Sequence, residues 1–121
     1  MIIIDEYKVK LKQIKAEIDD LHGSMGIDNA RKRLSEIEEI TAAPDFWNDA
    51  ANSHHILKEQ KAVKAKITAY DALYSLYEDA GTYLELAADA DDGSLDEEIG
   101  ETFRNLEKTV EKLRLETLLS G

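Results

Sequence analysis

The sequence has no cysteine, a single proline (Pro44) and a single tryptophan (Trp47) in 121 residues. Without thiols, disulfides and thiolate metal sites are excluded. The apolar start, residues 2–4, is too short for a signal peptide or a membrane span, and two acidic residues follow it directly. We therefore expect a cytoplasmic protein without a membrane segment.

The charge of the chain is unevenly distributed. The formal net charge is −11, and the segment 78–98 holds nine acidic residues but no lysine or arginine. We expect no direct nucleic-acid binding from this acidic segment, because affinity for phosphates depends on basic side chains. The densest basic cluster is formed by Lys58, Lys61, Lys64 and Lys66. We interpret it as a solvated helix face, with a weak phosphate or protein contact as the alternative.

Apolar residues recur at intervals of three and four along most of the chain, which predicts an all-α fold of about four long helices. Together with 43% hydrophobic and 34% charged residues, the pattern indicates one antiparallel, coiled-coil-like bundle over residues 1–121. The expected helices cover about 3–21, 28 to the proline, 49–88, and 94–119. Their expected inward seams include Ile14, Ile18, Val63, Ile67, Tyr74, Tyr77, Phe103 and Leu106, with Leu73 on a second stripe.

Three residues mark the expected helix ends. Gly23 is expected to end the first helix in the left-handed conformation. Asp28 is a plausible N-cap of the second helix. Ser94 and Glu97 have the spacing of a capping box at the start of the fourth helix.

The segment Pro44-Asp45-Phe46-Trp47-Asn48-Asp49 separates the second and third helices. Pro44 ends the preceding helix, since it has no amide proton and restricts the residue before it. Asn48 is a good N-cap for the next helix. Phe46 and Trp47 are expected to be buried between the flanking helices. We predict a structural joint formed by Pro44, Phe46, Trp47 and Asn48.

Motifs for catalysis or metal binding are incomplete. Asp89-x-Asp91-x-Gly93 places its glycine at the wrong position for a calcium loop, which also needs a glutamate at its end. Asp19-x-x-His22 occurs once, whereas a di-metal bundle needs two such pairs and two more carboxylates. We expect no catalytic residue, no cofactor and no metal.

The joint sequence resembles that of the N-terminal domain of bacterial peptide chain release factor 2, a class I release factor. Other parts of the chain fit the same family: Leu21-His22-Gly23-Ser24-Met25, Arg33-Leu34-Ser35-Glu36-Ile37-Glu38, Leu84-Glu85-Leu86-Ala87 and Leu118-Leu119-Ser120-Gly121. The resemblance implies a domain of a longer protein that terminates translation at UAA and UGA codons. It also implies contact with the stalk base of the large ribosomal subunit and with the release-factor GTPase.

In that family, peptide release depends on a Gly-Gly-Gln loop and codon choice on a Ser-Pro-Phe tripeptide; neither occurs in this sequence. The resemblance therefore implies a non-catalytic domain, and the sequence leaves its oligomeric state open. One alternative is a stand-alone coiled-coil adaptor that dimerises through exposed seams. A remote one is a chorismate-mutase-like helical enzyme, suggested by Lys15-x-x-Ile18-Asp19 with scattered cations at Arg104 and Arg114.

Overall fold

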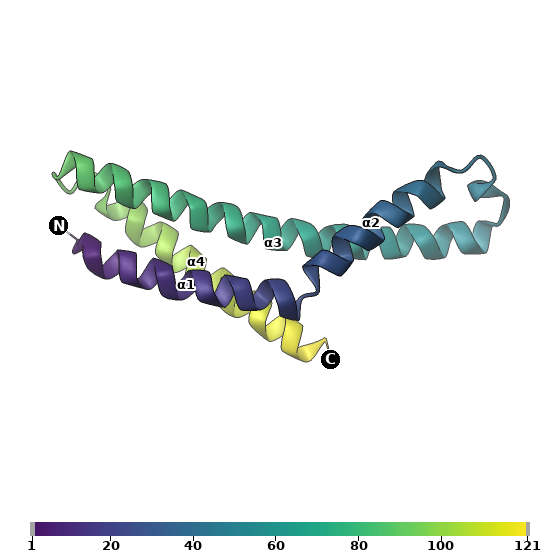
Figure 1. Cartoon of the computed structure of the whole chain (residues 1–121), viewed down its shortest axis with the longest axis horizontal. Helices are drawn as coiled ribbons and strands as arrows, with labels where there is room; N and C mark the ends of the chain where they lie inside the picture. Colours follow the sequence, from purple (N-terminus) through teal and green to yellow (C-terminus); the bar gives the residue numbers. More distant parts are fainter. Residues whose placement is uncertain (1, 121) are drawn as a thin grey trace. The chain divides into compact units, whose positions relative to one another are not determined.

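The structure, a computed structural model, describes residues 2–120 (Figure 1). This part of the chain contains four α-helices, one short 3-10 helix and no strand. They are α1 (Ile4–Ser24), α2 (Ile27–Ala42), η1 (Phe46–Asn48), α3 (Ala50–Ala90) and α4 (Asp96–Leu119). The all-α class predicted from the apolar periodicity is confirmed. None of the helices within residues 2–120 combines the length and the apolar composition that a membrane span requires.

The chain divides into two compact units. The first unit contains α1 up to Leu21, α3 from Asp71 onwards, and α4. The second unit, His22 to Tyr70, contains α2, η1 and the first part of α3.

In the first unit, three helices enclose a common core. The rings of Tyr7 and Phe103 meet edge-on with centroids 4.8 Å apart, and Lys10 Nζ lies 3.5 Å from Glu107 Oε1. Because the contacting residues advance together along both helices, α1 and α4 run parallel, and α3 runs in the opposite direction (Figure 1). The buried residues of this core are Ile14, Ile18, Leu21, Leu73, Ala80, Leu84, Ala87, Ile99, Phe103, Leu106, Val110 and Leu113.

The predicted seams of α1 and α4 are buried, and the seam of α3 is confirmed in part: Ile67 is buried, whereas Val63 is half-buried. Leu73, expected on a second stripe, is fully buried. Tyr74 and Tyr77 are only half-buried and form an edge-to-face ring pair at 5.7 Å. A helix that packs against two others buries a face broader than one seam. Since these seams are buried within one chain, the hypothesis of an adaptor that dimerises through exposed seams loses its premise.

The turn between α1 and α2 is made by Gly26 and not by Gly23, which corrects the prediction. Gly23 lies within the last turn of α1, whereas Gly26 has φ 63° and ψ 43°, in the left-handed region that suits glycine. The carbonyl of Gly26 accepts the Ala30 N–H at 2.9 Å, so α2 begins immediately after it. Asp28 lies in the first turn of α2 rather than at its N-cap. The reversal at Gly26 allows Ile27 to be fully buried.

The predicted break after α3 is present. Asp91 and Gly93 have positive φ values of 49° and 72°. Asp92 Oδ1 accepts the Ser94 N–H at 2.9 Å. Hydrogen bonding from the side chain and the N–H of Ser94 holds the pKa of Asp92 below its ordinary value. The carboxylate of Asp92 therefore stabilises the turn itself.

The capping box predicted from Ser94 and Glu97 does not form. Leu95 precedes α4, and no side chain caps the helix. Ser94 lies one residue too early, and its N–H is already bonded to Asp92. The first residue of α4, Asp96, instead accepts the Ile2 N–H with Oδ2 at 3.0 Å.

Candidate functional site at the joint between α2 and α3

The joint, defined here as residues 43–49, has a backbone fixed by local hydrogen bonds. Ala43 is extended, with φ −66° and ψ 136°, as expected for a residue before proline. The Phe46 N–H donates to the Ala43 carbonyl at 3.1 Å, and the Asn48 N–H donates to the Asp45 carbonyl at 3.0 Å. These bonds set the single turn of η1, which begins two residues after Pro44.

Phe46 anchors the joint to the second unit. Its side chain is only 5% exposed and packs with Ile37 of α2 and Ile56 of α3. Ile40 and Leu57 cover this cluster from the sides. The predicted burial of Phe46 between the flanking helices is thus observed.

Trp47 is not buried, so the prediction for this residue is wrong. Its side chain is 66% exposed, and its ring meets Phe46 edge-on with centroids 4.9 Å apart. Consecutive side chains of a 3-10 helix point about 120° apart because the helix has three residues per turn. Only one of the two aromatics can therefore face the helices, and Phe46 fills that place.

Asp49 caps α3, which corrects the prediction for Asn48. Asp49 has an extended backbone, and its Oδ1 accepts the Asn52 N–H at 3.1 Å. Asn48 is the last residue of η1 and is exposed. The buried hydroxyl of Ser53 lies 2.6 Å from the Phe46 carbonyl and 2.9 Å from that of Asp49, so it ties α3 to the joint. Nothing in the sequence pattern singled out Ser53.

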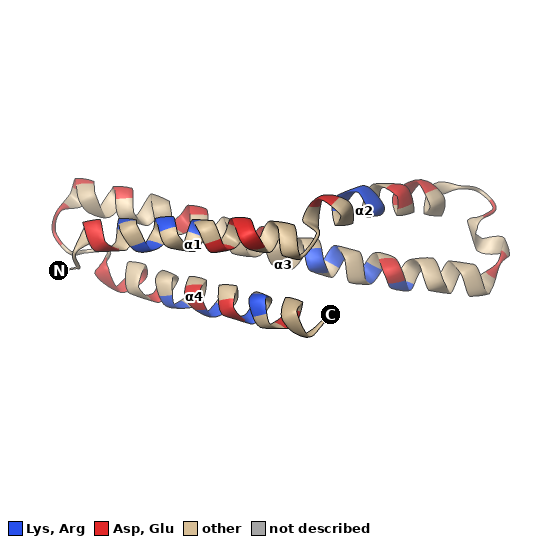
Figure 2. Ribbon diagram, turned by 60° about the horizontal axis from the view of Figure 1, so that its bottom comes forward, with Lys and Arg blue, Asp and Glu red and all other residues tan. Residues whose placement is uncertain are grey.

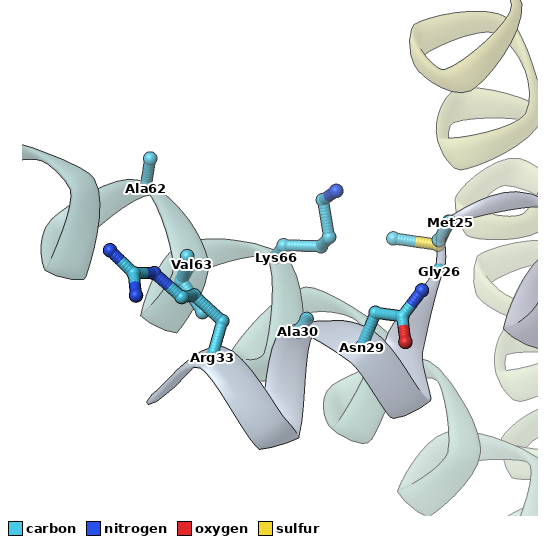
Figure 3. A pocket seen from close by; sticks show the side chains of 8 residues that line it. All are labelled: Met25, Gly26, Asn29, Ala30, Arg33, Ala62, Val63 and Lys66. Carbon is cyan, nitrogen blue, oxygen red and sulfur yellow. The ribbon is translucent and has the colours of Figure 1, made fainter. Parts of the chain in front are cut away.

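A groove of about 360 Å³ lies between α2 and α3 within the second unit (Figure 3). Met25 and Ala30 are buried, while Lys66 is exposed. Figure 3 shows the long side chains of Arg33 and Lys66 beside the small side chains of Ala30 and Ala62. The groove is lined by Met25, Gly26, Asn29, Ala30, Arg33, Ala62, Val63 and Lys66.

Arg33, on the edge of this groove, is paired with two carboxylates. Its Nε and Nη2 donate to Glu59 at 2.6 and 2.8 Å, and its Nη1 donates to Glu36 at 3.0 Å. These hydrogen bonds lower the pKa of Glu59 and raise that of Arg33. The guanidinium therefore stabilises the pairing of α2 with α3.

The charges of the second unit separate along its length (Figure 2). Lysine and arginine occupy 31–33 on α2 and recur through 58–66 on α3, where the four lysines are exposed. Between residues 34 and 57, five carboxylates and no lysine or arginine surround the joint. The end of this unit that holds the joint is therefore acidic, and its lysines and arginines lie farther along both helices.

The histidines do not form a metal site with their neighbours. His22 Nε2 lies 3.4 Å from Asp28 Oδ1, and the ring meets Tyr70 edge-on at 5.4 Å. His54 and His55 are exposed on α3. Among residues 2–120, no three or more histidine and carboxylate side chains are placed to hold a metal ion.

Two of the three cations proposed for a chorismate-mutase-like site, Lys15 and Arg114, are engaged within their own helices. Lys15 Nζ donates to both carboxylate oxygens of Asp19, at 2.8 and 3.0 Å, which raises the pKa of Lys15. Arg114 donates to Glu111 at 2.7 and 3.0 Å and lowers the pKa of that carboxyl. These pairings do not favour a dicarboxylate-binding site.

Residues 30–121 match the family described as PCRF domain. Three similar relatives are all named peptide chain release factor 2. That of a Nitratiruptor species is 34% identical over 116 residues, covering 96% of this chain and 32% of the relative. That of Salinispora tropica is 32% identical, covering 96% and 31%, and that of Nautilia profundicola is 30% identical, covering 95% and 31%.

The chain thus spans about a third of the length of the curated relatives that it matches, 32% in the first case. The similarity extends over nearly all of this chain, including the joint, and agrees with the resemblance drawn from the joint sequence. The chain therefore belongs to the PCRF domain family of peptide chain release factors.

Proposed function

We propose that the chain acts as the N-terminal domain of a longer peptide chain release factor that terminates translation at UAA and UGA codons. In this role it contacts the stalk base of the large ribosomal subunit and the release-factor GTPase in the cytoplasm, without catalysing a reaction itself. The observation that carries the proposal is the family match over residues 30–121. Similarity to peptide chain release factor 2 along 96% of the chain supports it.

The charges of the second unit suggest where the ribosome is contacted. The exposed lysines of 58–66 and the exposed Lys32 of α2 offer cations to ribosomal RNA. The acidic segment 78–98 would raise the negative potential near phosphates and would oppose such contact. We therefore assign ribosome binding to the second unit. We expect the acidic segment 78–98 to lie away from ribosomal RNA.

A chimera tests the proposal. The chain replaces the matching segment of the Nitratiruptor release factor 2, and peptide release is measured on ribosomes programmed with UAA, UGA or UAG. We expect release at UAA and UGA, and no release by the 121-residue chain alone. A chimera that binds the ribosome no better than a protein lacking the segment would contradict the proposal. Release by the chain alone would contradict its non-catalytic role.

The basic face is tested by charge reversal. The double variant Lys61→Glu, Lys64→Glu should cosediment less with large ribosomal subunits than the unaltered chain does. The loss of binding should be larger at low salt than at high salt. The matched control reverses Lys8 and Lys12, which are equally exposed on α1. An equal loss of binding in both double variants would show that only net charge matters. Ribosome binding could then no longer be assigned to the second unit.

A further inference from the structure

Trp47 is exposed although it is a large aromatic residue next to the buried Phe46. Tryptophan is among the most buried residue types on average, yet this side chain is 66% exposed while its neighbour Phe46 is 5% exposed. Its backbone is held by the hydrogen bond from Asn48 to Asp45 and by the Ser53 hydroxyl on the Phe46 carbonyl. A partner would therefore meet an aromatic side chain on a fixed backbone, and little backbone entropy would be lost on binding.

The surroundings of Trp47 restrict the chemistry of that partner. The segment 34–57 carries five carboxylates, no lysine or arginine, and two histidines counted as neutral at pH 7. Asp45 and Asp49 flank the tryptophan in sequence and are exposed, and Figure 2 shows acidic residues at this end of the second unit. Carboxylates within a Debye length of ~8 Å repel phosphates and attract arginine or lysine.

An indole face is the strongest aromatic partner for a cation, and tryptophan is enriched among the residues that dominate binding energy. We infer that Trp47, with Asp45 and Asp49, docks on a basic protein surface of the large ribosomal subunit, and not on its RNA. In this contact an arginine or lysine of the partner lies over the indole, and neighbouring cations pair with the two carboxylates. The inference rests on the proposed function and adds to it the partner class and the contact residues.

Photocrosslinking identifies the class of partner directly. The whole chain, with p-benzoylphenylalanine at position 47, is bound to purified large ribosomal subunits and irradiated. We expect an adduct that ribonuclease leaves intact and that yields, on tryptic digestion, peptides of a ribosomal protein together with those of the chain. An adduct that ribonuclease destroys would overturn the inference, and so would cosedimentation of the chain without any adduct from position 47.

Binding of variants to the same subunits measures the contribution of each group. Trp47→Ala should weaken binding about tenfold or more, as expected for a hot-spot tryptophan. Asp45→Lys should also weaken it, with a larger effect at low salt. Asp45 is chosen because Asp49 also caps α3. The control is Leu86→Ala, which removes a side chain that is 51% exposed in the first unit and should leave binding unchanged.

Thermal unfolding of each variant checks that the fold is retained. If the unaltered chain does not bind large subunits, both the proposed function and this inference fail. If it binds, and Trp47→Ala binds equally well, only the inference fails. Equal weakening by Trp47→Ala and Leu86→Ala would likewise overturn the assignment of the contact to the joint.

Discussion

Arg33 of α2 and Glu59 of α3 form a bidentate pair, with Nε–Oε2 and Nη2–Oε1 distances of 2.6 and 2.8 Å. The planar guanidinium matches both carboxylate oxygens, which an ammonium group cannot do. We therefore expect Arg33→Lys to lower the midpoint of thermal unfolding, measured by circular dichroism, although the charge is kept. Lys32→Arg, at an exposed neighbouring position, is the control. An unchanged midpoint for Arg33→Lys would mean that the charge of residue 33 stabilises the fold and that the bidentate hydrogen bonding adds nothing.

The same pair makes stability depend on pH. Hydrogen bonding from Arg33 lowers the pKa of Glu59 below its ordinary value of 4.5. A carboxyl with a lowered pKa in the folded state contributes stability that is fully present above the ordinary value and is lost as the pH falls through the folded value. The midpoint difference between the unaltered chain and Glu59→Gln should therefore be constant above about pH 5 and shrink as the pH falls below 4.5. A difference that persists under strong acid would contradict this assignment.

Phe46 and Trp47 should respond oppositely to truncation. Phe46→Ala removes a buried aromatic and should cost about 3–5 kcal/mol of unfolding free energy, which lowers the unfolding midpoint by roughly ten degrees or more. Trp47→Ala removes an exposed ring and only the edge-on contact with Phe46, worth about 0.5–1.5 kcal/mol. Tryptophan fluorescence of the unaltered chain should resemble that of indole in water. A blue-shifted spectrum would show instead that Trp47 is shielded.

Alanine variants of Asp49 and Asn48 test which of these two residues caps α3. Asp49→Ala removes the acceptor for the Asn52 N–H and should destabilise the chain by about 1 kcal/mol. Asn48→Ala should change the unfolding free energy far less, because Asn48 belongs to η1. Urea unfolding of both variants measures the difference. A larger loss for Asn48→Ala would restore Asn48 as the cap.

Alanine variants of Gly23 and Gly26 test the backbone of the turn between α1 and α2. A methyl group added at either glycine would meet no atom within 4 Å. Gly26→Ala should destabilise the chain by about 1–2 kcal/mol, since Gly26 has φ +63° and alanine avoids this region. Gly23→Ala should stabilise it by about 0.5–1 kcal/mol, because Gly23 lies within α1. Calorimetric midpoints would test both signs.

The helices could be predicted from the sequence because their apolar residues recur at helical intervals, and burial of Ile18, Phe103 and Leu106 follows directly from that period. The pairing of Arg33 with Glu59 could not be predicted. These residues are 26 positions apart on different helices, and their contact depends on how far η1 shifts one helix along the other.

The errors at the joint have a local cause. Phe46 and Trp47 are both large and apolar, so composition favours burial of both, and only the turn of η1 decides which ring faces the helices. Asn48 and Asp49 are almost equally good N-caps, and a shift of one residue exchanges them. The contact residues of the candidate site therefore required the backbone of the joint.

The acidic turn after α3 should not contribute to ribosome binding. Under the proposed function, replacing Asp89, Asp91 and Asp92 with asparagine in a full-length factor should leave stalk-base binding unchanged or slightly tighter, because three charges that repel phosphates are removed. The substitutions suit the turn: asparagine tolerates the positive φ of 49° at Asp91, and its carbonyl can still accept the Ser94 N–H at position 92. Circular dichroism should confirm unchanged helicity. Binding weakened severalfold at fixed salt would show that this turn itself contacts a basic protein, and the docking surface would then have to be sought there instead of at Trp47.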